Sequence, residues 1–370
     1  MNLETKIKKI SRLSEEIIRP EELKIFLEKG IPLKHYIGFE ISGLAHLGTA
    51  LFTSIKIKDF QECGIETNIF LADWHSWINE KLGGNLEVIK TYGVNYFKEV
   101  FNITLKSLGA QPVNFILASE MYSQSEVYWQ TLIEISKLTT LSRAKRSLDI
   151  LGRKLGQEVD MAKLIYPLMQ VADIFVGGFN FVHAGIDQRK AHVIARQVAL
   201  KIKISPLRFK NKKLKPIIFH QPLLMSIGKP PIIPQNEEEL DKIKTEIKMS
   251  KSKPEGCIFI HDSPQDIEKK IIKAFCPPEN TFYNPILNLV ELIIFPLKNQ
   301  FKVKKIDSST QIYENINQLK NDYAQGLIHP LDLKESVIDN LKEILKPIHQ
   351  YFAEGYGLRL KKTIEDLIQK

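Results

Sequence analysis

Two residues near the start of the chain, His46 and Gly48, stand where a nucleotide phosphate could bind. The stretch 36–49 reads as a buried strand, a glycine-containing turn and the beginning of a helix. Backbone N–H groups in the first turn of a helix have no internal partner and attract anions. Gly48 would let a nucleotide approach the backbone, and the His46 imidazole can donate to a phosphate oxygen without a permanent charge. Alone, such a pair is more often a detail of a loop or core.

A lysine- and serine-rich cluster lies far along the chain, and it comprises Lys248, Met249, Ser250, Lys251 and Ser252. Taken singly, such a cluster is usually a solvated basic loop. In this order, however, the two stretches resemble the paired signatures of class I aminoacyl-tRNA synthetases, His-Ile-Gly-His and Lys-Met-Ser-Lys-Ser. The second signature is matched letter for letter. In the first, Thr49 replaces the usual second histidine, and its hydroxyl can still donate to a phosphate.

Composition sets the class of molecule that carries these residues. The chain has 370 residues, 44% of them hydrophobic, which suffices for a real core and most often for two domains. No apolar run reaches membrane-spanning length, and the N-terminus does not read as a signal peptide. The three cysteines have no metal-ligand spacing, so we expect a reducing, cytoplasmic location and no metal site. The net charge of +9 fits a polyanionic partner, although a lysine-rich surface gives the same value.

Strands and helices alternate around the His46 stretch. We expect helices at 3–17 and ending near Gly30, then a strand, a helix at about 47–63, a strand at 69–73, a helix at about 86–108 and a strand at 113–117. Strands that alternate with helices at this spacing predict a parallel sheet with crossover helices. Ligands then gather at the carboxyl ends of the strands.

A third group of polar residues, Tyr166, Gln170 and Asp173, falls on one face of an expected helix, at i, i+4 and i+7. The plain interpretation is a half-polar surface stripe. Apolar residues flank the stripe on all sides, however, so the helix reads as buried, and buried polar groups need partners. A bound ligand could be that partner.

With these residues the resemblance narrows to tyrosyl-tRNA synthetases of the archaeal and eukaryotic type. The matching stretches run through most of the chain, at 36–48, 71–75, 138–147, 165–174, 187–190, 248–252, 262–264 and 329–334. The resemblance implies that Tyr36 and Asp173 bind the phenolic hydroxyl of a tyrosine, whose ammonium end is held by Tyr166, Gln170 and Gln188. His75 and Met121 fall where the pocket lining is expected.

The resemblance also implies the residues that act on ATP. The catalytic group would be His46, Gly48, Thr49, Lys248 and Lys251. The nucleotide would lie against Gly38, Glu40, His46, Gly48, Gly185, Asp187, Met249, Ser250 and Ser252. Ala184 replaces the first residue of the Gly-Gly pair that is usual at the ribose.

The C-terminal part reads as helical. Ser263, Pro264 and Asp266 read as an N-cap, a first-turn proline and a capping acid, and further helices are expected at about 285–294, 331–345 and beyond Pro347. The resemblance implies an anticodon-binding domain here. Its tRNA-binding residues would include His329, Pro330 and Asp332 at the first anticodon base, with Arg189 near the first acceptor base pair and Arg143 as a further contact.

We therefore expect an α/β fold, with a Rossmann-like parallel-sheet catalytic domain that carries a helical insertion and precedes an all-helical C-terminal domain. The expected parts are an N-terminal helical segment (1–30), the catalytic domain (31–240, with a dimer-interface insertion at about 120–165), a mobile linker (241–262) and the anticodon-binding domain (263–370). The residues at 201–247 have no functional interpretation.

The implied reaction is ATP-dependent activation of L-tyrosine to tyrosyl-adenylate, followed by transfer to the 3′-terminal adenosine of tRNA(Tyr). Mg²⁺ would accompany the ATP, without a permanent cofactor, and the partners would be tRNA(Tyr), L-tyrosine, ATP and a second copy of the chain, without a membrane. A tryptophanyl-tRNA synthetase would not need an acid and a tyrosine aimed at a phenol. A catalytically silent RNA-binding paralogue would not keep both lysines. An adenylyltransferase for a small cofactor would not need the Lys248 cluster or the C-terminal domain.

Overall fold

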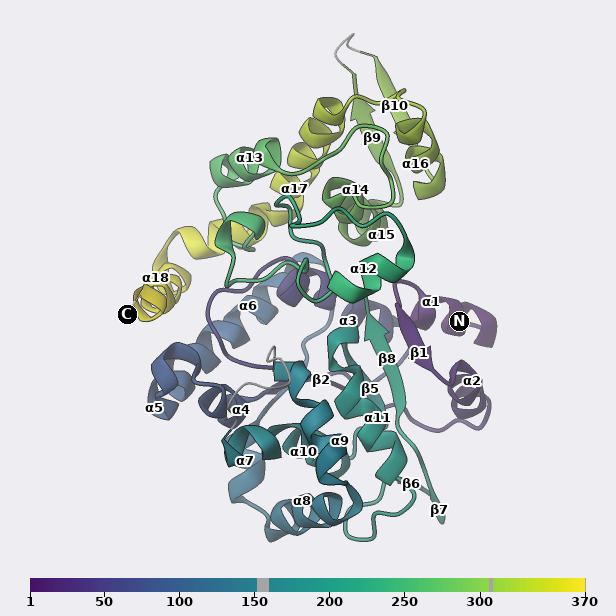
Figure 1. The fold of residues 1–370 in the computed structure, drawn as a ribbon, viewed down its shortest axis with the longest axis vertical. Helices are drawn as coiled ribbons and strands as arrows, with labels where there is room; N and C mark the ends of the chain where they lie inside the picture. Colours follow the sequence, from purple (N-terminus) through teal and green to yellow (C-terminus); the bar gives the residue numbers. More distant parts are fainter. Residues whose placement is uncertain (152–159, 306–308, 370) are drawn as a thin grey trace.

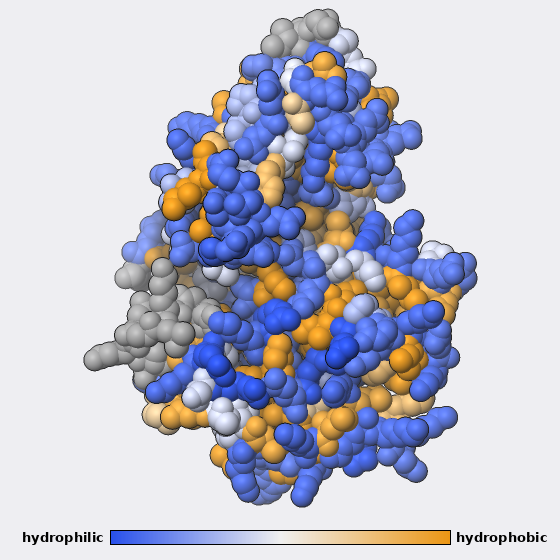
Figure 2. Space-filling view, turned by 45° about the vertical axis from the view of Figure 1, so that its right-hand side comes forward, coloured by the Kyte–Doolittle hydropathy of each residue, from blue (hydrophilic) through white to orange (hydrophobic). Residues whose placement is uncertain are grey.

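The computed structural model describes residues 1–151, 160–305 and 309–369 (Figure 1). The insertion predicted at about 120–165 therefore lies partly outside the described residues. The sheet and its helices form the lower part of the view, the C-terminal helices form the upper part, and α12 (Glu237–Ile243) lies between them. In the space-filling view, hydrophilic residues cover most of the upper part, and hydrophobic residues are visible where the two parts meet (Figure 2).

The sheet has six strands in the order β1-β8-β5-β2-β3-β4. Their bounds are Glu16–Ile18 (β1), His35–Phe39 (β2), Asn68–Leu71 (β3), Asn114–Leu117 (β4), Phe181–Gly185 (β5) and Ile217–Gln221 (β8). β8, β5, β2, β3 and β4 are parallel, whereas β1 pairs antiparallel with β8. This arrangement confirms the predicted α/β class and the parallel sheet.

β2, β3 and β4 lie where the sequence predicts strands, whereas β1, β5 and β8 were not predicted. All four residues of β3 are buried, which matches the continuous apolar run expected of a parallel strand. β5 and β8 are buried as well, but His183, His220 and Gln221 interrupt their apolar runs. The segment 201–247, which has no functional interpretation from the sequence, thus contains β8, the strand between the edge strand β1 and β5.

The predicted helices at 47–63 and 86–108 are confirmed. The first consists of η1 (Gly48–Phe52) and α3 (Thr53–Glu62), and the second of α5 (Leu86–Val88), η3 (Ile89–Gly93) and α6 (Val94–Ser107). The remaining helices of this part are α2 (Pro20–Glu28), α4 (Asp73–Ile78), α7 (Ala118–Ser123), α8 (Glu126–Leu138), α9 (Leu141–Arg146), α10 (Met161–Val176) and α11 (Arg189–Val198). α10 carries the predicted stripe and packs against α8 and α11.

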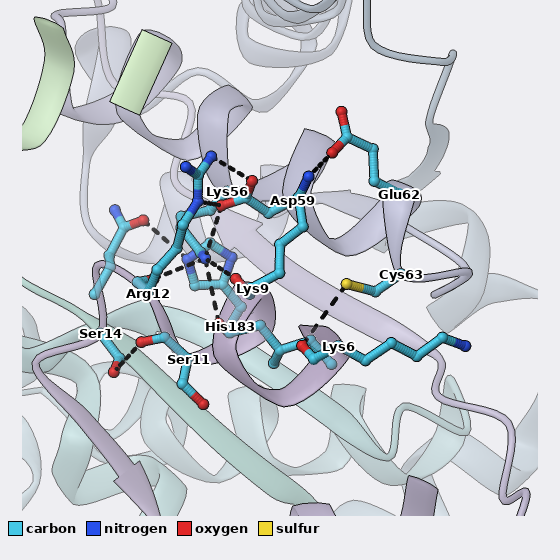
Figure 3. Close-up of polar contacts among 12 residues, drawn as sticks. Lys6, Lys9, Ser11, Arg12, Ser14, Lys56, Asp59, Glu62, Cys63 and His183 are labelled. Atoms are coloured by element: carbon cyan, nitrogen blue, oxygen red, sulfur yellow. Dashed lines mark hydrogen bonds and ion pairs between the residues drawn. The ribbon is translucent and has the colours of Figure 1, made fainter. Parts of the chain in front are cut away.

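The N-terminal helix is shorter than predicted. α1 ends at Ser11 instead of residue 17, and residues 16–18 form β1, because pairing with β8 satisfies their backbone groups. Lys56 on α3 is fully buried, and its Nζ donates to the carbonyl oxygens of Ile10 at 3.2 Å and Arg12 at 2.8 Å (Figure 3). The carbonyls that end a helix lack internal partners, so this ammonium caps α1 and fixes it to α3. Asp59 lies 3.1 Å from the same Nζ and compensates its charge.

The C-terminal part is helical with one exception. Its helices are α13 (Pro264–Lys273), α14 (Pro285–Leu289), η7 (Val290–Ile294), α15 (Phe295–Lys298), α16 (Ile316–Ala324), α17 (Pro330–Ala353) and α18 (Gly355–Gln369). The predicted capping box of Ser263 and Asp266 is confirmed. The all-helical prediction is wrong for β9 (Phe301–Lys304) and β10 (Thr310–Tyr313), an antiparallel pair in which Phe301 and Val303 are buried and alternate with exposed lysines.

α17 continues through Pro347, where the sequence analysis ends a helix at 345. A proline inside a helix costs about 3 kcal/mol. Ile348 and Phe352 beyond it are buried, and burial of two such side chains gains about 3–6 kcal/mol, so packing outweighs the lost hydrogen bond. One hydrophobic cluster joins residues near the sheet, such as Phe97, to Leu341 on α17. The domain boundaries at residues 30, 240 and 262 stay predictions.

Candidate active site

The His46 ring is held by its own turn. The backbone N–H of Gly48 donates to Nδ1 at 3.1 Å, and Nε2 lies 3.0 Å from Thr49 Oγ1. Burial, with Lys251 and Lys248 nearby, lowers the pKa of His46 to about 3, so the ring is neutral. Since Nδ1 accepts, Nε2 carries the proton and donates to Thr49. The Thr49 hydroxyl keeps its own proton for a ligand, which gives this replacement of the second signature histidine a physical role.

The lysine-rich loop reaches the same place through backbone pairing. Leu47 N donates to Ile258 O at 3.0 Å, and Ile260 N donates to Ala45 O at 3.1 Å. These bonds tie the segment after the loop to the turn that holds His46. The two signature stretches, which are remote in sequence, therefore share one site.

Both signature lysines have defined surroundings. Lys248 Nζ lies 2.6 Å from Asp187 Oδ2. Lys251 Nζ lies over the Phe97 ring, 5.7 Å from its centroid, and burial lowers its pKa to about 8. Two positive charges thus lie beside a neutral imidazole donor, an arrangement suited to a polyphosphate.

A cavity of about 750 Å³ connects these groups. All the residues predicted for catalysis, ATP and tyrosine line it: Tyr36, Gly38, Glu40, His46, Gly48, Thr49, His75, Tyr166, Gln170, Asp173, Gly185, Asp187, Gln188, Lys248, Met249, Ser250, Lys251 and Ser252. Met121 does not line it and packs against the neighbouring hydrophobic cluster.

Asp173 lies fully buried in this cavity. Its Oδ1 accepts from the hydroxyls of Tyr122 at 2.9 Å and Tyr128 at 3.3 Å. Its Oδ2 is buried without a hydrogen-bond partner among the described residues, and His75 Nε2 lies 3.8 Å away. Burial raises the pKa of Asp173. Sequence reasoning missed Tyr122 and Tyr128. The only available signal was that a buried acid requires donors, which does not say where in the chain they come from.

Tyr36 forms one wall beside Asp173. Its ring stacks on Phe179 with centroids 4.9 Å apart, and burial raises the pKa of its hydroxyl. That hydroxyl lies against Gly38, where an added Cβ would come within 2.7 Å of Tyr36 Oη. In this structure Gly38 therefore leaves space for the Tyr36 hydroxyl.

A second unsatisfied acceptor lies on α10, about one turn before Asp173. Gln170 Nε2 donates to Gln188 Oε1 at 3.4 Å, whereas Gln170 Oε1 is buried without a partner among the described residues. Tyr166 donates to Glu40 Oε1 at 2.7 Å and packs edge-on against the His75 ring. The cavity thus offers one unpaired acceptor on Asp173 and another on Gln170, so a ligand with two separate donor groups would satisfy both.

The residues predicted to contact tRNA lie outside this cavity. Arg189 pairs with Glu16, and Arg143 lies on α9. His329 Nδ1 accepts from Leu331 N at 3.2 Å, so His329 caps α17 and Pro330 is the first residue of that helix. The Asp332 side chain is mostly buried, with 5% of the residue exposed. The predicted contacts of these residues with tRNA stay predictions.

Comparison with known proteins places this site in a family. Residues 28–346 match the family described as tRNA synthetases class I (W and Y). The chain belongs to this family of class I tRNA synthetases. Among the described residues of this synthetase, no helix combines the length and apolar character that crossing a membrane requires, and no three His, Cys, Asp or Glu side chains are grouped so as to hold a metal ion.

Relatives that match along nearly the whole chain distinguish the tyrosine branch of this family from the tryptophan branch. The synthetase is 51% identical to the tyrosine–tRNA ligase of Thermococcus sibiricus over 99% of both chains. The structure of the tyrosyl-tRNA synthetase of Pyrococcus horikoshii complexed with L-tyrosine superposes with a TM-score of 0.94, at 48% identity, over 98% of this chain and 100% of that one. A tryptophanyl-tRNA synthetase of Aeropyrum pernix K1 reaches a TM-score of 0.63 at 17% identity, over 94% and 84% of the two chains, which shows a shared fold alone.

Proposed function

We propose that this synthetase is a tyrosine–tRNA ligase, which activates L-tyrosine with ATP and transfers the tyrosyl group to the 3′-terminal adenosine of tRNA(Tyr). The observation that carries the proposal is Asp173 Oδ2, a buried acceptor of a cavity-lining side chain that has no hydrogen-bond partner among the described residues. A phenolic O–H is the donor that it lacks. The unpaired Gln170 Oε1 accepts from the ammonium group at the other end of the same ligand.

Asp173 and Tyr36 together favour tyrosine over tryptophan, because a phenolic hydroxyl can donate to the acid and accept from Tyr36, whereas an indole N–H can only donate. A site that hydrogen-bonds a hydroxyl rejects the analogue without it, because its own polar groups remain unpaired. Tyrosyl-tRNA synthetases are themselves the standard example of this effect, with a known discrimination against phenylalanine of about 10⁵, a value that belongs to the family and does not follow from this structure. An indole has one N–H and no hydroxyl. Tyr36, which lines the same cavity as Asp173, provides the second contact to the phenol.

The phosphate end of the cavity supports the activation step. The tyrosine carboxylate attacks the α-phosphate of Mg-ATP, and pyrophosphate leaves, so no side chain is needed as a nucleophile. The Thr49 hydroxyl, which accepts from His46 Nε2–H, donates its own proton to a phosphate oxygen, while Lys248 and Lys251 bring positive charge to the triphosphate. Such groups act by position and charge on the transition state. Gly185 and Asp187 lie at the ribose.

The remaining parts of the proposal concern partners and location. Arg189 contacts the tRNA acceptor end near the first base pair, and His329 and Asp332 contact the first anticodon base. The synthetase acts as a homodimer through α8 and α10, in the cytoplasm. Three thiols without metal-ligand spacing are consistent with that compartment.

Pyrophosphate exchange into ATP, measured with each amino acid in turn, tests the activity and the substrate together. We expect exchange with tyrosine alone. Asp173→Asn keeps the shape of the side chain but puts an amide donor where the phenol needs an acceptor, so its preference for tyrosine over phenylalanine should fall. Exchange with tryptophan, or an unchanged preference in Asp173→Asn, would contradict the proposal.

A further inference from the structure

Arg189 forms an ion pair with Glu16, a residue that is remote in sequence. Arg189 is the first residue of α11, and Glu16 is the first residue of the edge strand β1. Arg189 Nε lies 2.8 Å from Glu16 Oε2, and Nη2 lies 3.0 Å from Oε1. Such a two-point contact fixes the plane of the guanidinium as well as its position.

Glu16 also contacts His220. His220 lies directly opposite it in the β1–β8 register, and His220 Nδ1 is 3.0 Å from Glu16 Oε2. An ionised carboxylate only accepts hydrogen bonds, so Nδ1 carries the proton. The His220 side chain is fully buried, and burial lowers its pKa, which leaves Nε2 bare. His192 Nδ1 donates to that nitrogen at 2.9 Å. A chain of defined hydrogen bonds therefore runs from the buried core to the guanidinium.

This arrangement leaves one edge of the guanidinium available. Arginine has five N–H donors, and Glu16 accepts from one on Nε and one on Nη2. Both hydrogens on Nη1 and the second on Nη2 have no partner in the part of the chain that the structure describes, and the side chain is 51% exposed. Two parallel donors of this kind match the O6 and N7 acceptors of guanine or two phosphate oxygens. Arg189 stands two residues after Asp187, which lines the cavity and contacts Lys248.

A purely structural ion pair would look different, and the same helix offers one. Arg196 on α11 donates from Nη2 to both carboxylate oxygens of Glu22 and from Nη1 to Pro216 O, and its side chain is only 10% exposed. Its donors are directed into the protein. The Glu16 and Glu22 side chains are equally exposed, at 30%, so the two pairs differ in the exposure of the arginine and in the guanidinium nitrogens that meet the carboxylate.

We propose that Glu16 and His220 are positioning residues, which orient the Arg189 guanidinium so that its free edge reads the acceptor end of the tRNA. This inference rests on the proposed function, because it assumes that Arg189 contacts tRNA. Glu16 touches neither tyrosine nor ATP in this scheme. Its loss should therefore change tRNA selection without changing amino-acid activation.

A double-mutant cycle on aminoacylation tests the inference. It compares the wild type, Glu16→Gln, Arg189→Ala and the double variant, using two tRNA transcripts that differ only in the first acceptor base pair. We expect Glu16→Gln to lower the ratio of kcat/KM between the transcripts by about 5-fold or more, the lower range for a lost two-point base contact. Tyrosine-dependent pyrophosphate exchange should stay within about twofold of the wild type. In the Arg189→Ala background, Glu16→Gln should have no further effect.

Two further variants separate orientation from stability. Glu22→Gln weakens the matched pair on α11 and should leave the transcript ratio unchanged. His220→Asn keeps an N–H donor near the position of Nδ1, whereas His220→Leu does not, so His220→Asn should retain more of the discrimination. Thermal unfolding of each variant identifies any loss that comes from misfolding.

The outcomes distinguish failure of the inference from failure of the proposed function. An effect of Glu16→Gln that is equally large in the Arg189→Ala background would overturn the inference, as would an unchanged ratio in a Glu16→Gln variant when Arg189→Ala lowers it. If Arg189→Ala leaves charging unchanged, Arg189 does not read the tRNA, and Glu16 has nothing to orient. Absence of tyrosine-dependent exchange in the wild type would instead contradict the proposed function.

Discussion

Lys251 shows how burial sets the charge of a single residue in the cavity. An ammonium withdrawn from water loses hydration, and this lowers the Lys251 pKa to about 8, close to the pH at which the protein would work. Only the protonated form contributes positive charge to a triphosphate. The charge is fully present well below pH 8 and is lost as pH rises through that value.

We therefore expect kcat/KM for ATP in pyrophosphate exchange to fall as pH rises through about 8, since this ratio reports the free enzyme. Lys251→Arg stays charged over this range, so its profile should lose the falling limb even if its activity is lower throughout. Lys253→Arg, an exposed neighbour in the same loop, is the control and should keep the wild-type profile. A falling limb that persists in Lys251→Arg would assign the titration to another group.

At the scale of elements, α7 and α8 hold the acid that α10 brings to the cavity. Tyr122 and Tyr128 stack with ring centroids 4.0 Å apart, and both donate to Asp173 Oδ1. With that oxygen satisfied, Oδ2 is left for a ligand. Hydrogen bonds to a charged group contribute about 1.5–3 kcal/mol, so these tyrosines have a measurable share in the pocket.

Tyr122→Phe removes the shorter of the two donors while keeping the ring. We expect KM for tyrosine to rise by about 10-fold or more, and the preference for tyrosine over phenylalanine to fall, because Asp173 loses its fixed orientation. Steady-state exchange kinetics with both amino acids measure the two effects. Tyr313→Phe removes a hydroxyl that donates to Asp322 in the C-terminal part and serves as the control. Equal kinetics for the Tyr122 and Tyr313 variants would show that Tyr122 does not position the acid.

At the scale of the whole molecule, the helices that follow β4 expose apolar side chains. The exposed residues are Val127, Trp129, Ile133, Leu141, Met161 and Ile165, on α8, α9 and α10. Ile133 is 61% exposed and Met161 is 69% exposed. Exposed apolar residues on neighbouring helices are typical of a subunit interface. This agrees with the homodimer proposed above.

Ile133→Glu places a charge on this surface, and burying it between two subunits would be costly. We expect sedimentation equilibrium to show a dimer for the wild type and a shift towards monomer for Ile133→Glu. Ile312→Glu makes the same change at a 50% exposed isoleucine of β10 and should remain dimeric. A wild-type monomer, or a dimer that both variants retain, would place the contact elsewhere or exclude it.

The sequence by itself determined the class of the fold and indicated residues that the structure places around one cavity. His46, Gly48 and the Lys248 cluster are recognisable because their chemistry depends on residue type and on spacing within a few positions. The stripe of Tyr166, Gln170 and Asp173 follows from helical periodicity. β2, β3 and β4 follow from apolar runs between helices. These signals are local, so a sequence read in order contains them.

Only the tertiary structure decided which remote groups meet these residues. Tyr122 and Tyr128 reach Asp173, and Glu16 reaches Arg189, through contacts whose partners have no fixed spacing in sequence. β1 exists because β8 offers it a partner, and α17 passes Pro347 because buried residues follow. The secondary-structure preference of a short segment contributes little free energy compared with core packing and the pairing of buried polar groups. Tertiary contacts therefore override that preference at such positions.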